Sequence, residues 1–419
     1  MKTIRLQITI GALALVAAGR AAAEDWIERL DDYLAVSAFH GNVRAHFSGL
    51  IDLEGYYVQL PPPGLIYTDN RGLFNPRLTM FLDAQVGANV YAFVQSRVDR
   101  GFDPAERDAD VRLDEYAIRV SPWEDGRFSL QAGKFATITG NWAQRHDSWA
   151  NPFITAPMPY ENLTGIWDSV AVGSPTNLLF WGHVPNQYGG FGDATADKYL
   201  RNPIIWGPSY TSGLAVFGKI GKVEYAADFK NAGLASRPES WDVSEIGFEH
   251  PAFSGRLGFR PNEMWNFGIS ASSGPYLIPD AAPTLPPGKN IGDYREMVLA
   301  QDIRFEWHHL QLWAEFFEAR FQVPHVGDAD TFAYYLEAKY KFTPQFFGAL
   351  RWNQQLYDTI RTEDGESTAW GNPRWRIDAA LTHRFSARVQ LKAQYSLDHE
   401  DHAPREVSHN IAGQFTIRF

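Results

Sequence analysis

The sequence predicts an all-β protein, a transmembrane antiparallel β-barrel of about 16 strands with a long, inward-folded third loop. Three observations favour it: apolar and polar residues alternate in steps of two, tight and long connections alternate, and aromatic residues make up 14% of the chain, with 14 Trp. After the N-terminus, no stretch approaches 18 consecutive apolar residues, which argues against helical membrane spans. A secreted β-sandwich remains the alternative, because alternation alone does not show which strand face meets water.

Residues 1–23 predict a secretory signal peptide. Lys2 and Arg5 precede an apolar run over residues 8–18, and an Ala-Ala-Ala sequence completes an A-x-A cleavage site. The alternative is a membrane anchor, but the run is short for a span and Arg20 interrupts it. Cleavage removes three cationic side chains and changes the formal net charge from −11 to −14.

The mature chain is expected to begin with a short periplasmic segment, residues 24–40. Within it, Trp26, Leu30 and Leu34 have the spacing of one amphipathic helix over residues 25–36. Residues 41–419 are expected to form the barrel. The chain has no Cys, so it forms no disulfide and carries no CxxCH haem attachment.

Strand alternation is clear along most of this region. In "RVQLKAQYSLD", Leu391 and Tyr395 fall on an apolar face, while Lys392 and Gln394 fall on a polar face. Sixteen strands are predicted near residues 42–59, 73–85, 88–99, 111–121, 127–139, 208–218, 222–233, 252–261, 264–274, 296–307, 310–322, 331–341, 345–357, 373–384, 387–398 and 408–419.

The connections favour a barrel over a sandwich. Every second connection is tight, as in "VGAN", "KIGK", "RPNE" and "FTPQ". The others are predicted to be long: 60–72, 100–110, 140–207, 234–251, 275–295, 323–330, 358–372 and 399–407. Outer-membrane barrels have short periplasmic turns and longer outer loops, whereas a sandwich has no reason to sort its loops in this way. A count of 14 or 18 strands stays open.

Aromatic residues lie beside the tight turns or at the chain end, where a membrane interface would favour them. They are Trp123, Trp265, Trp307, Phe346, Phe385 and Phe419. The alternative is that they are ordinary strand aromatics. The ending Gly413-x-Phe415-x-Ile417-x-Phe419 resembles the C-terminal signal by which the bacterial outer-membrane assembly machinery recognises its barrels.

A second resemblance covers "DVRLDEYAIRVSPWEDGRFSLQAGKFATITGNW" and the following "NPFITAPMPYENLTG". These stretches, with the Gly133-Lys134-Phe135 step, are similar to the phosphate-selective porin O/P superfamily. The resemblance implies a 16-stranded, trimeric porin with an inward-folded third loop. It does not imply phosphate as the solute, and the sequence shows no dense arginine ladder across neighbouring strands.

The connection over residues 140–207 is by far the longest, and loops of this length usually have a role. It carries Arg145, His146 and Arg201, and Lys134 lies in the strand before it. We expect it to fold into the lumen and narrow the passage; an outer lid is the alternative. Its stretch "TNLLFWGH" could form a further strand.

Charged side chains on the lumen-facing positions would control selectivity. The expected lumenal cations are Arg77, Arg97, Arg119, Arg304, Lys339, Lys341, Arg351, Arg374, Arg376, Arg388, Lys392 and Arg418. The expected lumenal anions are Asp83, Asp99, Glu115, Asp302, Glu306, Glu315, Glu337 and Asp378. The expected cations therefore outnumber the expected anions on the lumenal wall. The acids of "TEDGE" and "DHEDH" are expected in outer loops. Mixed charges that simply keep the lumen wet are an equal alternative.

These observations predict an outer-membrane porin for passive diffusion of small hydrophilic solutes or ions, with a mild anion preference. No catalytic motif, metal site or cofactor is expected, and "DHEDH" is interpreted as a solvated acidic loop. The expected partners are outer-membrane lipid and lipopolysaccharide, the assembly machinery, two further copies in a homotrimer, and small solutes or anions, with no nucleic acid. The alternative is a barrel that sheathes a partner protein, as in a porin–cytochrome electron conduit.

Overall fold

The computed structural model describes residues 34–61, 64–66, 68, 70–99, 110–183, 201–402 and 407–419. The predicted signal peptide lies outside these residues, and so does nearly all of the helix expected over residues 25–36. The part that is described, Ala35–Ala38, forms a short strand, β1, instead of continuing a helix.

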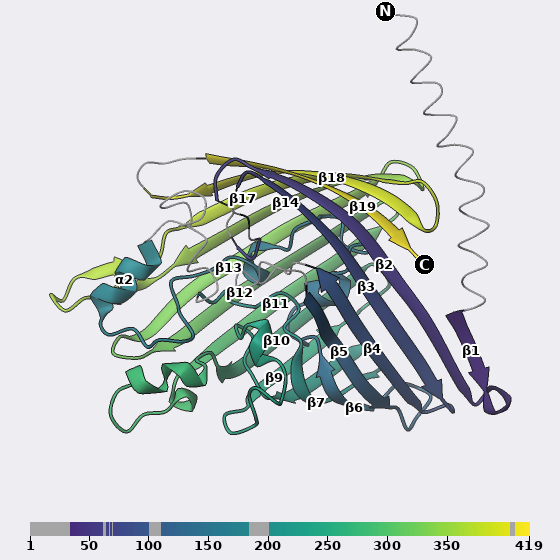
Figure 1. The fold of residues 1–419 in the computed structure, drawn as a ribbon, viewed down its shortest axis with the longest axis horizontal. Helices are drawn as coiled ribbons and strands as arrows, with labels where there is room; N and C mark the ends of the chain where they lie inside the picture. The colour runs from purple at the N-terminus through teal and green to yellow at the C-terminus, as the bar shows by residue number, and fades with distance from the viewer. Residues whose placement is uncertain are drawn as a thin grey trace, which may run out of the picture.

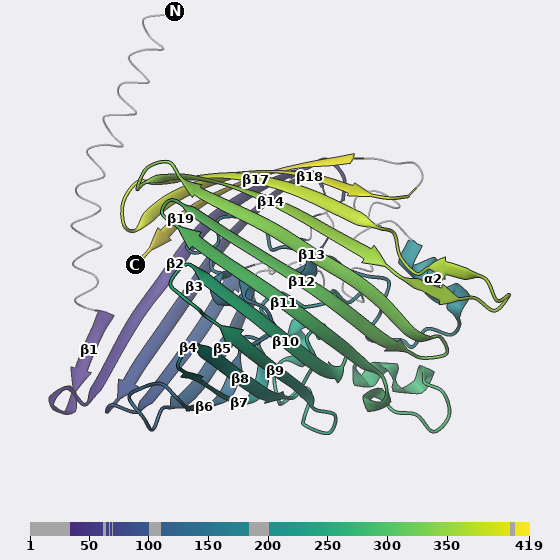
Figure 2. The ribbon, with the colours of Figure 1, turned by 180° about the vertical axis from the view of Figure 1, so that it is seen from behind.

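Sixteen long strands of the described chain form the wall of a closed barrel, as predicted (Figure 1, Figure 2). They are β2 (Val43–Val58), β3 (Gly72–Val86), β4 (Val90–Asp99), β5 (Asp110–Val120), β6 (Ser129–Phe135), β7 (Thr211–Ile220), β8 (Val223–Lys230), β9 (Ala252–Phe259), β10 (Trp265–Pro275), β11 (Arg295–Trp307), β12 (Leu310–Val323), β13 (Gly327–Lys341), β14 (Phe346–Tyr357), β17 (Arg374–Arg384), β18 (Val389–Glu400) and β19 (Val407–Arg418).

All neighbouring strands pair antiparallel in chain order, and β19 closes the barrel on β2. The closing register runs from Asn410 opposite Val58 to Arg418 opposite Leu50. Beyond it, the backbone N–H of Phe419 donates to the carbonyl oxygen of Gly49 at 3.0 Å. Closure leaves no long unpaired edge at this seam.

The two ends of the barrel differ, and we call them the turn end and the loop end. The turn end carries the tight connections, such as 87–89, 221–222 and 308–309. One prediction is wrong at the loop end: the connection between β12 and β13 is a short turn over residues 324–326, because β13 begins earlier than expected.

The loop end also carries a small amount of further structure. Figure 1 shows the helix α2 (Pro175–His183) projecting there beside the two-stranded hairpin of β15 (Thr359–Arg361) and β16 (Ser367–Ala369). The stretch "TNLLFWGH" is thus helical and not a strand. The 3-10 turns are η1 (Phe39–Gly41), η2 (Trp142–Arg145), η3 (Met158–Tyr160), η5 (Pro238–Ser240), η6 (Pro279–Thr284) and η7 (Ile291–Asp293). No helix in the described residues is both long and apolar enough to cross a membrane.

The outward face of the wall is apolar and the inward face is mainly polar. On β18, Leu391 is 44% exposed on the outside, whereas Lys392 is 1% exposed on the inside. Aromatic side chains gather on the outside at the turn end: Trp265 stacks on Phe267 with ring centroids 5.4 Å apart, and Phe419 lies 6.4 Å from Phe47. This arrangement is typical of a transmembrane barrel with an interfacial aromatic girdle.

Candidate functional site

The candidate site is the lumen, and the connection between β6 and β7 enters it. Its described residues, 136–183 and 201–210, supply most of the molecule's buried aromatic side chains that do not belong to the wall. Tyr160 is fully buried, and it packs with Trp142 of the same connection against Phe317 of the wall. Figure 2 shows this segment running inside the ring of strands. We call it the lumen loop.

Cationic side chains of β14, β17 and β18 hold the lumen loop against one side of the wall. Arg351 donates to the carbonyl oxygens of Thr155 and Ala156, each at 3.1 Å. Arg376 donates to the same Ala156 oxygen at 2.6 Å, and Lys392 donates to the carbonyl oxygen of Asn151 at 2.7 Å. These bonds satisfy backbone acceptors that the irregular loop would otherwise leave unpaired.

Acids neutralise the same cations. Asp378 accepts from Arg351 at 2.9 Å and also pairs with Arg376. Arg374 pairs with Asp398 at 3.1 Å and with Glu400 at 2.7 Å. Arg351, Arg374, Arg376 and Lys392 are therefore buried beneath the loop and do not face an open passage, contrary to their expected pore-lining positions. Two acids of "DHEDH" lie in these buried pairs, so that stretch is only partly a solvated outer loop.

A second set of contacts fixes the loop on β12 and β13. Arg145 pairs with Glu337 at 2.6 Å and lies over the Trp313 ring, with its guanidinium carbon 4.4 Å from the ring centroid. Tyr160 donates to Glu315 at 2.5 Å, as does the backbone N–H of Asn141 at 2.7 Å. Arg145 belongs to the connection that we expected to narrow the passage, and its side chain anchors that connection to the wall.

The opposite side of the lumen, along β3–β9, contains open space. A cavity of about 820 Å³ opens toward the turn end, and its walls include Asp83, Tyr91 and Glu115. Arg119 lies in it with its guanidinium carbon 4.8 Å from the Phe217 ring centroid, and it donates to Gln131. We call this space the vestibule.

A smaller cavity of about 90 Å³ lies further toward the loop end, and His146 lines both cavities. We call it the arginine cavity, because Arg77, Arg97 and Arg112 line it from the wall, opposite the lumen loop. Burial lowers the pKa of the His146 imidazole below its ordinary value, so this ring is expected to be neutral at pH 7. The fixed positive charge at this point therefore comes from the guanidinium groups.

Carboxylates lie behind these guanidinium groups. Arg77 pairs with Asp52 at 3.2 Å and with Glu54 at 2.5 Å. Arg97 and Arg112 share Asp99 and Asp114, at distances of 3.1–3.8 Å. The three arginine side chains are 11–14% exposed and the four acids at most 2%. A solute in the cavity thus meets the cations first.

The remaining predicted residues lie elsewhere. The ammonium of Lys134 pairs with Asp242 at 2.9 Å and is not in the open lumen. Arg304 pairs with Glu306 at the turn-end rim, and Arg388 lies in the turn between β17 and β18. Arg201 pairs with Trp167 through an isolated backbone bridge. These four residues are not gathered with the arginine cavity.

Sequence reasoning missed Arg112, Asp114 and the acids of β2. Asp52 and Glu54 alternate with outward Ile51 and Leu53, so the alternation rule would have found them. Arg112 could not be found in that way. A register shift opposite Gln95 and Ser96 breaks the alternation on β5, which turns Arg112 inward together with Arg119 despite their odd spacing.

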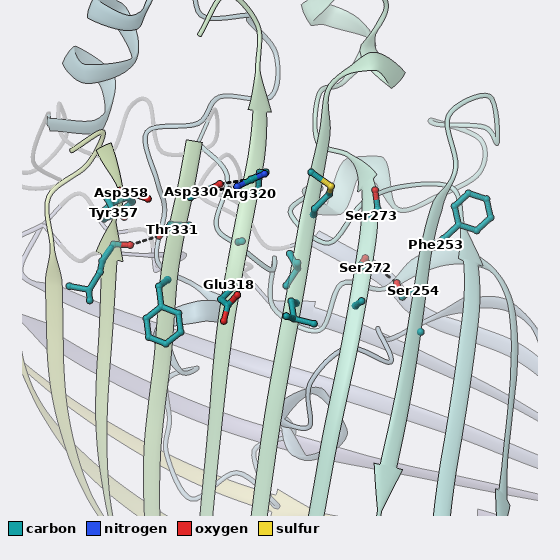
Figure 3. Close-up of a pocket in the computed structure, with 18 residues that line it drawn as sticks. Phe253, Ser254, Ser272, Ser273, Glu318, Arg320, Asp330, Thr331, Tyr357 and Asp358 are labelled. Atoms are coloured by element: carbon teal, nitrogen blue, oxygen red, sulfur yellow. Dashed lines mark hydrogen bonds and ion pairs between the residues drawn. The ribbon is translucent and has the colours of Figure 1, made fainter. Parts of the chain in front are cut away.

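A further hollow is not in the lumen. It measures about 980 Å³ and lies on the outward face near the loop end of β9–β14, where Phe253, Glu318 and Arg320 point away from the lumen (Figure 3). Arg320 there forms an exposed pair with Asp330 at 2.7 Å. In the described part of the chain, no three His, Asp or Glu side chains are placed to hold a metal ion.

The fold is that of bacterial porins. The chain is similar to the outer-membrane channel DcaP of Acinetobacter baumannii, with TM-score 0.56 and 10% identity over 92% of this chain and 100% of that one. It is similar to the anion-selective porin from Comamonas acidovorans, with TM-score 0.54 and 11% identity over 90% of this chain and 100% of that one. It is also similar to the trimer form of Vibrio cholerae OmpT, with TM-score 0.52 and 9% identity over 90% of this chain and 99% of that one. No family model and no curated protein matches the chain. At these identities the likeness shows the architecture, a porin-type 16-stranded barrel.

Proposed function

We propose that the protein is an outer-membrane porin that lets small hydrophilic solutes diffuse passively, with a mild preference for anions. The observation that carries this proposal is the one-sided filling of the lumen. The lumen loop is held against β12–β18, while the vestibule and the arginine cavity follow each other along the other side and meet at His146.

The preference is expected to be mild because the guanidinium groups do not act alone. Arg77, Arg97 and Arg112 reach the cavity, but Asp52, Glu54, Asp99 and Asp114 lie directly behind them. A solute at contact distance interacts mainly with the nearer charge, whereas at longer range the acids cancel the field. The resemblance of residues 111–139 to the phosphate-selective porin O/P superfamily supports anions as a class and does not select phosphate.

The apolar outer face supports a place in the outer membrane, among lipid and lipopolysaccharide. Ile411, Phe415 and Ile417 alternate on the outside of β19 and end at Phe419, which supports recognition by the outer-membrane assembly machinery. A homotrimer is proposed from the fold, since the similar Vibrio cholerae OmpT has a trimer form.

The second candidate, a sheath around a partner such as a cytochrome, fits the lumen less well. The lumen loop occupies the space that an inserted polypeptide would need, and Tyr160, Phe153 and Met158 are buried in it. A sheath would require this loop to leave its bonds to Arg351, Arg376 and Lys392.

Single-channel recording of the purified, full-length protein in planar bilayers tests the proposal. We expect stable conductance steps in KCl. In a salt gradient, the sign of the reversal potential should indicate a modest preference for anions. A folded, heat-modifiable barrel that conducts no ions would contradict the channel. Haem that co-purifies with the barrel would favour the sheath.

A further inference from the structure

The arginine cavity has hydrogen-bond donors that no described acceptor satisfies. Trp142 and Ser148 line the cavity, and the indole N–H of Trp142 and the hydroxyl of Ser148 have no hydrogen-bond partner among the described residues, although the two residues are only 5% and 7% exposed. The Nε–H groups of Arg97 and Arg112 lie near Asp114 without hydrogen-bond geometry. Burial of a donor without an acceptor is unfavourable, so the indole N–H of Trp142 and the hydroxyl of Ser148 favour a bound acceptor.

The other walls of the cavity are largely aromatic. Phe153, Tyr160, Trp206 and Trp241 line it, and each is at most 3% exposed. Such rings are flat, apolar surfaces that favour another ring in offset or edge-to-face contact. The cavity thus combines a cationic, donor-rich wall with an apolar, aromatic one.

Apart from the carboxylates behind the arginines, few acceptors on the cavity wall compete for these donors. Glu161 also lines the cavity, but Arg376 binds its carboxylate. Gln414 contributes an amide whose NH₂ group already donates to Glu54 at 2.6 Å, which leaves its oxygen as the free acceptor. His146 bonds with Tyr210 at 2.5 Å and with the carbonyl oxygen of Ala143 at 2.6 Å.

We propose that the arginine cavity is a binding site for small aromatic carboxylates on their way through the channel. The carboxylate would accept from Arg97, Arg112 and the Trp142 indole, and the ring would lie among the aromatic side chains. The volume of about 90 Å³ suits one small planar acid and not a bulky hydrated solute. This inference rests on the proposed diffusion function.

The shape of the wall argues against two simpler ligands. Inorganic phosphate would satisfy the donors but would lie against aromatic surface that it cannot use. A neutral aromatic alcohol would use the rings but would bring no charged acceptor to the side of the guanidinium groups that faces the cavity. The two walls together select a solute that has both a carboxylate and an aromatic ring, because a solute that uses only one wall forgoes part of the binding free energy.

Solute block of single channels tests this proposal on the full-length protein. Benzoate added at millimolar concentration should interrupt the KCl current, with an apparent Kd about tenfold or more below those of acetate, phosphate and benzyl alcohol. Conductance in KCl alone tests the diffusion function separately. A conducting channel that binds benzoate no better than acetate, phosphate or benzyl alcohol would overturn the aromatic-carboxylate site and leave the channel function standing.

Substitutions then locate the site. Trp142→Phe keeps a ring but removes the N–H, and it should weaken benzoate block about five- to tenfold. Arg112→Lys keeps the charge but loses the planar fork, and it should weaken benzoate block as well. Trp149→Phe is the matched control, since Trp149 lies outside the cavity over Arg384 and Arg418. Unchanged benzoate block in both Trp142→Phe and Arg112→Lys would overturn the assignment.

Discussion

Leu391 and Lys392 are neighbours in the sequence and lie in opposite environments. Leu391 is on the outer face of β18, while the ammonium of Lys392 donates to the loop carbonyl oxygens of Ser148 and Asn151. At this scale, one step along a strand separates a side chain that meets lipid from one that holds the lumen loop.

Leu391→Arg should destabilise the barrel by about 2–4 kcal/mol, because a charge would replace an apolar side chain on the lipid face near mid-membrane. Urea titration of the protein folded into lipid vesicles measures the change. Leu391→Ile is the control and should change the free energy of unfolding little. An unaltered urea midpoint for Leu391→Arg would mean that this face does not contact lipid.

Lys392→Met should act differently, by loosening the loop. It leaves the buried carbonyl oxygen of Asn151 without its donor, at a cost of about 1–3 kcal/mol, while the carbonyl oxygen of Ser148 still accepts from Gln390. We therefore expect a noisier open channel of higher mean conductance in single-channel recordings. The sequence alone placed Lys392 among the lumenal cations; its contacts with the loop give it a structural role. A quiet channel of unchanged conductance would contradict this role.

At the scale of elements, the lumen loop sets the width of the passage, and the strand β19 closes the barrel. The loop is a segment without long regular structure that the wall holds in one place, through Arg145, Arg351 and Arg376. β19 joins the last part of the chain to β2, far away in sequence.

Deletion of residues 145–165 should raise single-channel conductance several-fold, because it removes the part of the loop that fills the lumen beside β12–β18. Deletion of the hairpin tip 363–365 is the control. That tip is exposed at the loop end and should leave the conductance unchanged. Equal conductance in the 145–165 deletion and the native protein would place the narrowest point outside the lumen loop.

Removal of Phe419 should slow or prevent assembly of the barrel. Its backbone forms the last two bonds of the seam with Gly49, and its ring contacts Phe47. The fraction of heat-modifiable, membrane-inserted protein in cells is the measurement. Phe419→Tyr keeps the ring and should assemble normally, whereas full assembly without residue 419 would contradict a role for the terminal aromatic.

At the scale of the whole molecule, the charges divide between the inside and the outside. Inside, acids and arginines are paired and buried, as at Arg351 and Asp378. Outside, the acids Glu363, Asp364 and Glu366 are exposed at the loop end, in agreement with the predicted acidic outer loops. The exposed acids are screened by salt far more than the buried groups.

The anion preference should therefore grow with salt concentration. At about 0.01 M KCl the Debye length is about 30 Å, and the outer acids gather cations over the mouth. At about 1 M it is about 3 Å, so only the arginines at the narrow point still act. Reversal potentials at fixed concentration ratio should show this trend. The double substitution Asp364→Asn with Glu366→Gln should weaken this dependence on salt. An anion preference that does not change with salt concentration would contradict the explanation.

The sequence by itself determined the strands and the closed barrel, and it favoured the count of sixteen over the alternatives of 14 and 18. Alternation has a period of two residues and depends only on which face is apolar, so it can be read locally along β18 or β19. The outward apolar face and the turn-end aromatics follow from the same pattern. Only strand ends that depend on pairing with a neighbouring strand were misplaced. For example, β13 begins at Gly327 and not near residue 331.

Only the tertiary structure decided which charged residues face a solute. Arg376 contacts Glu161 and Lys392 contacts Asn151 across more than 200 residues of sequence, and no local pattern reveals such a contact. The loop can satisfy its backbone only where the wall offers donors, so it covers the cations of β14–β18. It leaves Arg77, Arg97 and Arg112 open on the other side, and Arg112 faces inward because a bulge breaks the alternation that the sequence shows.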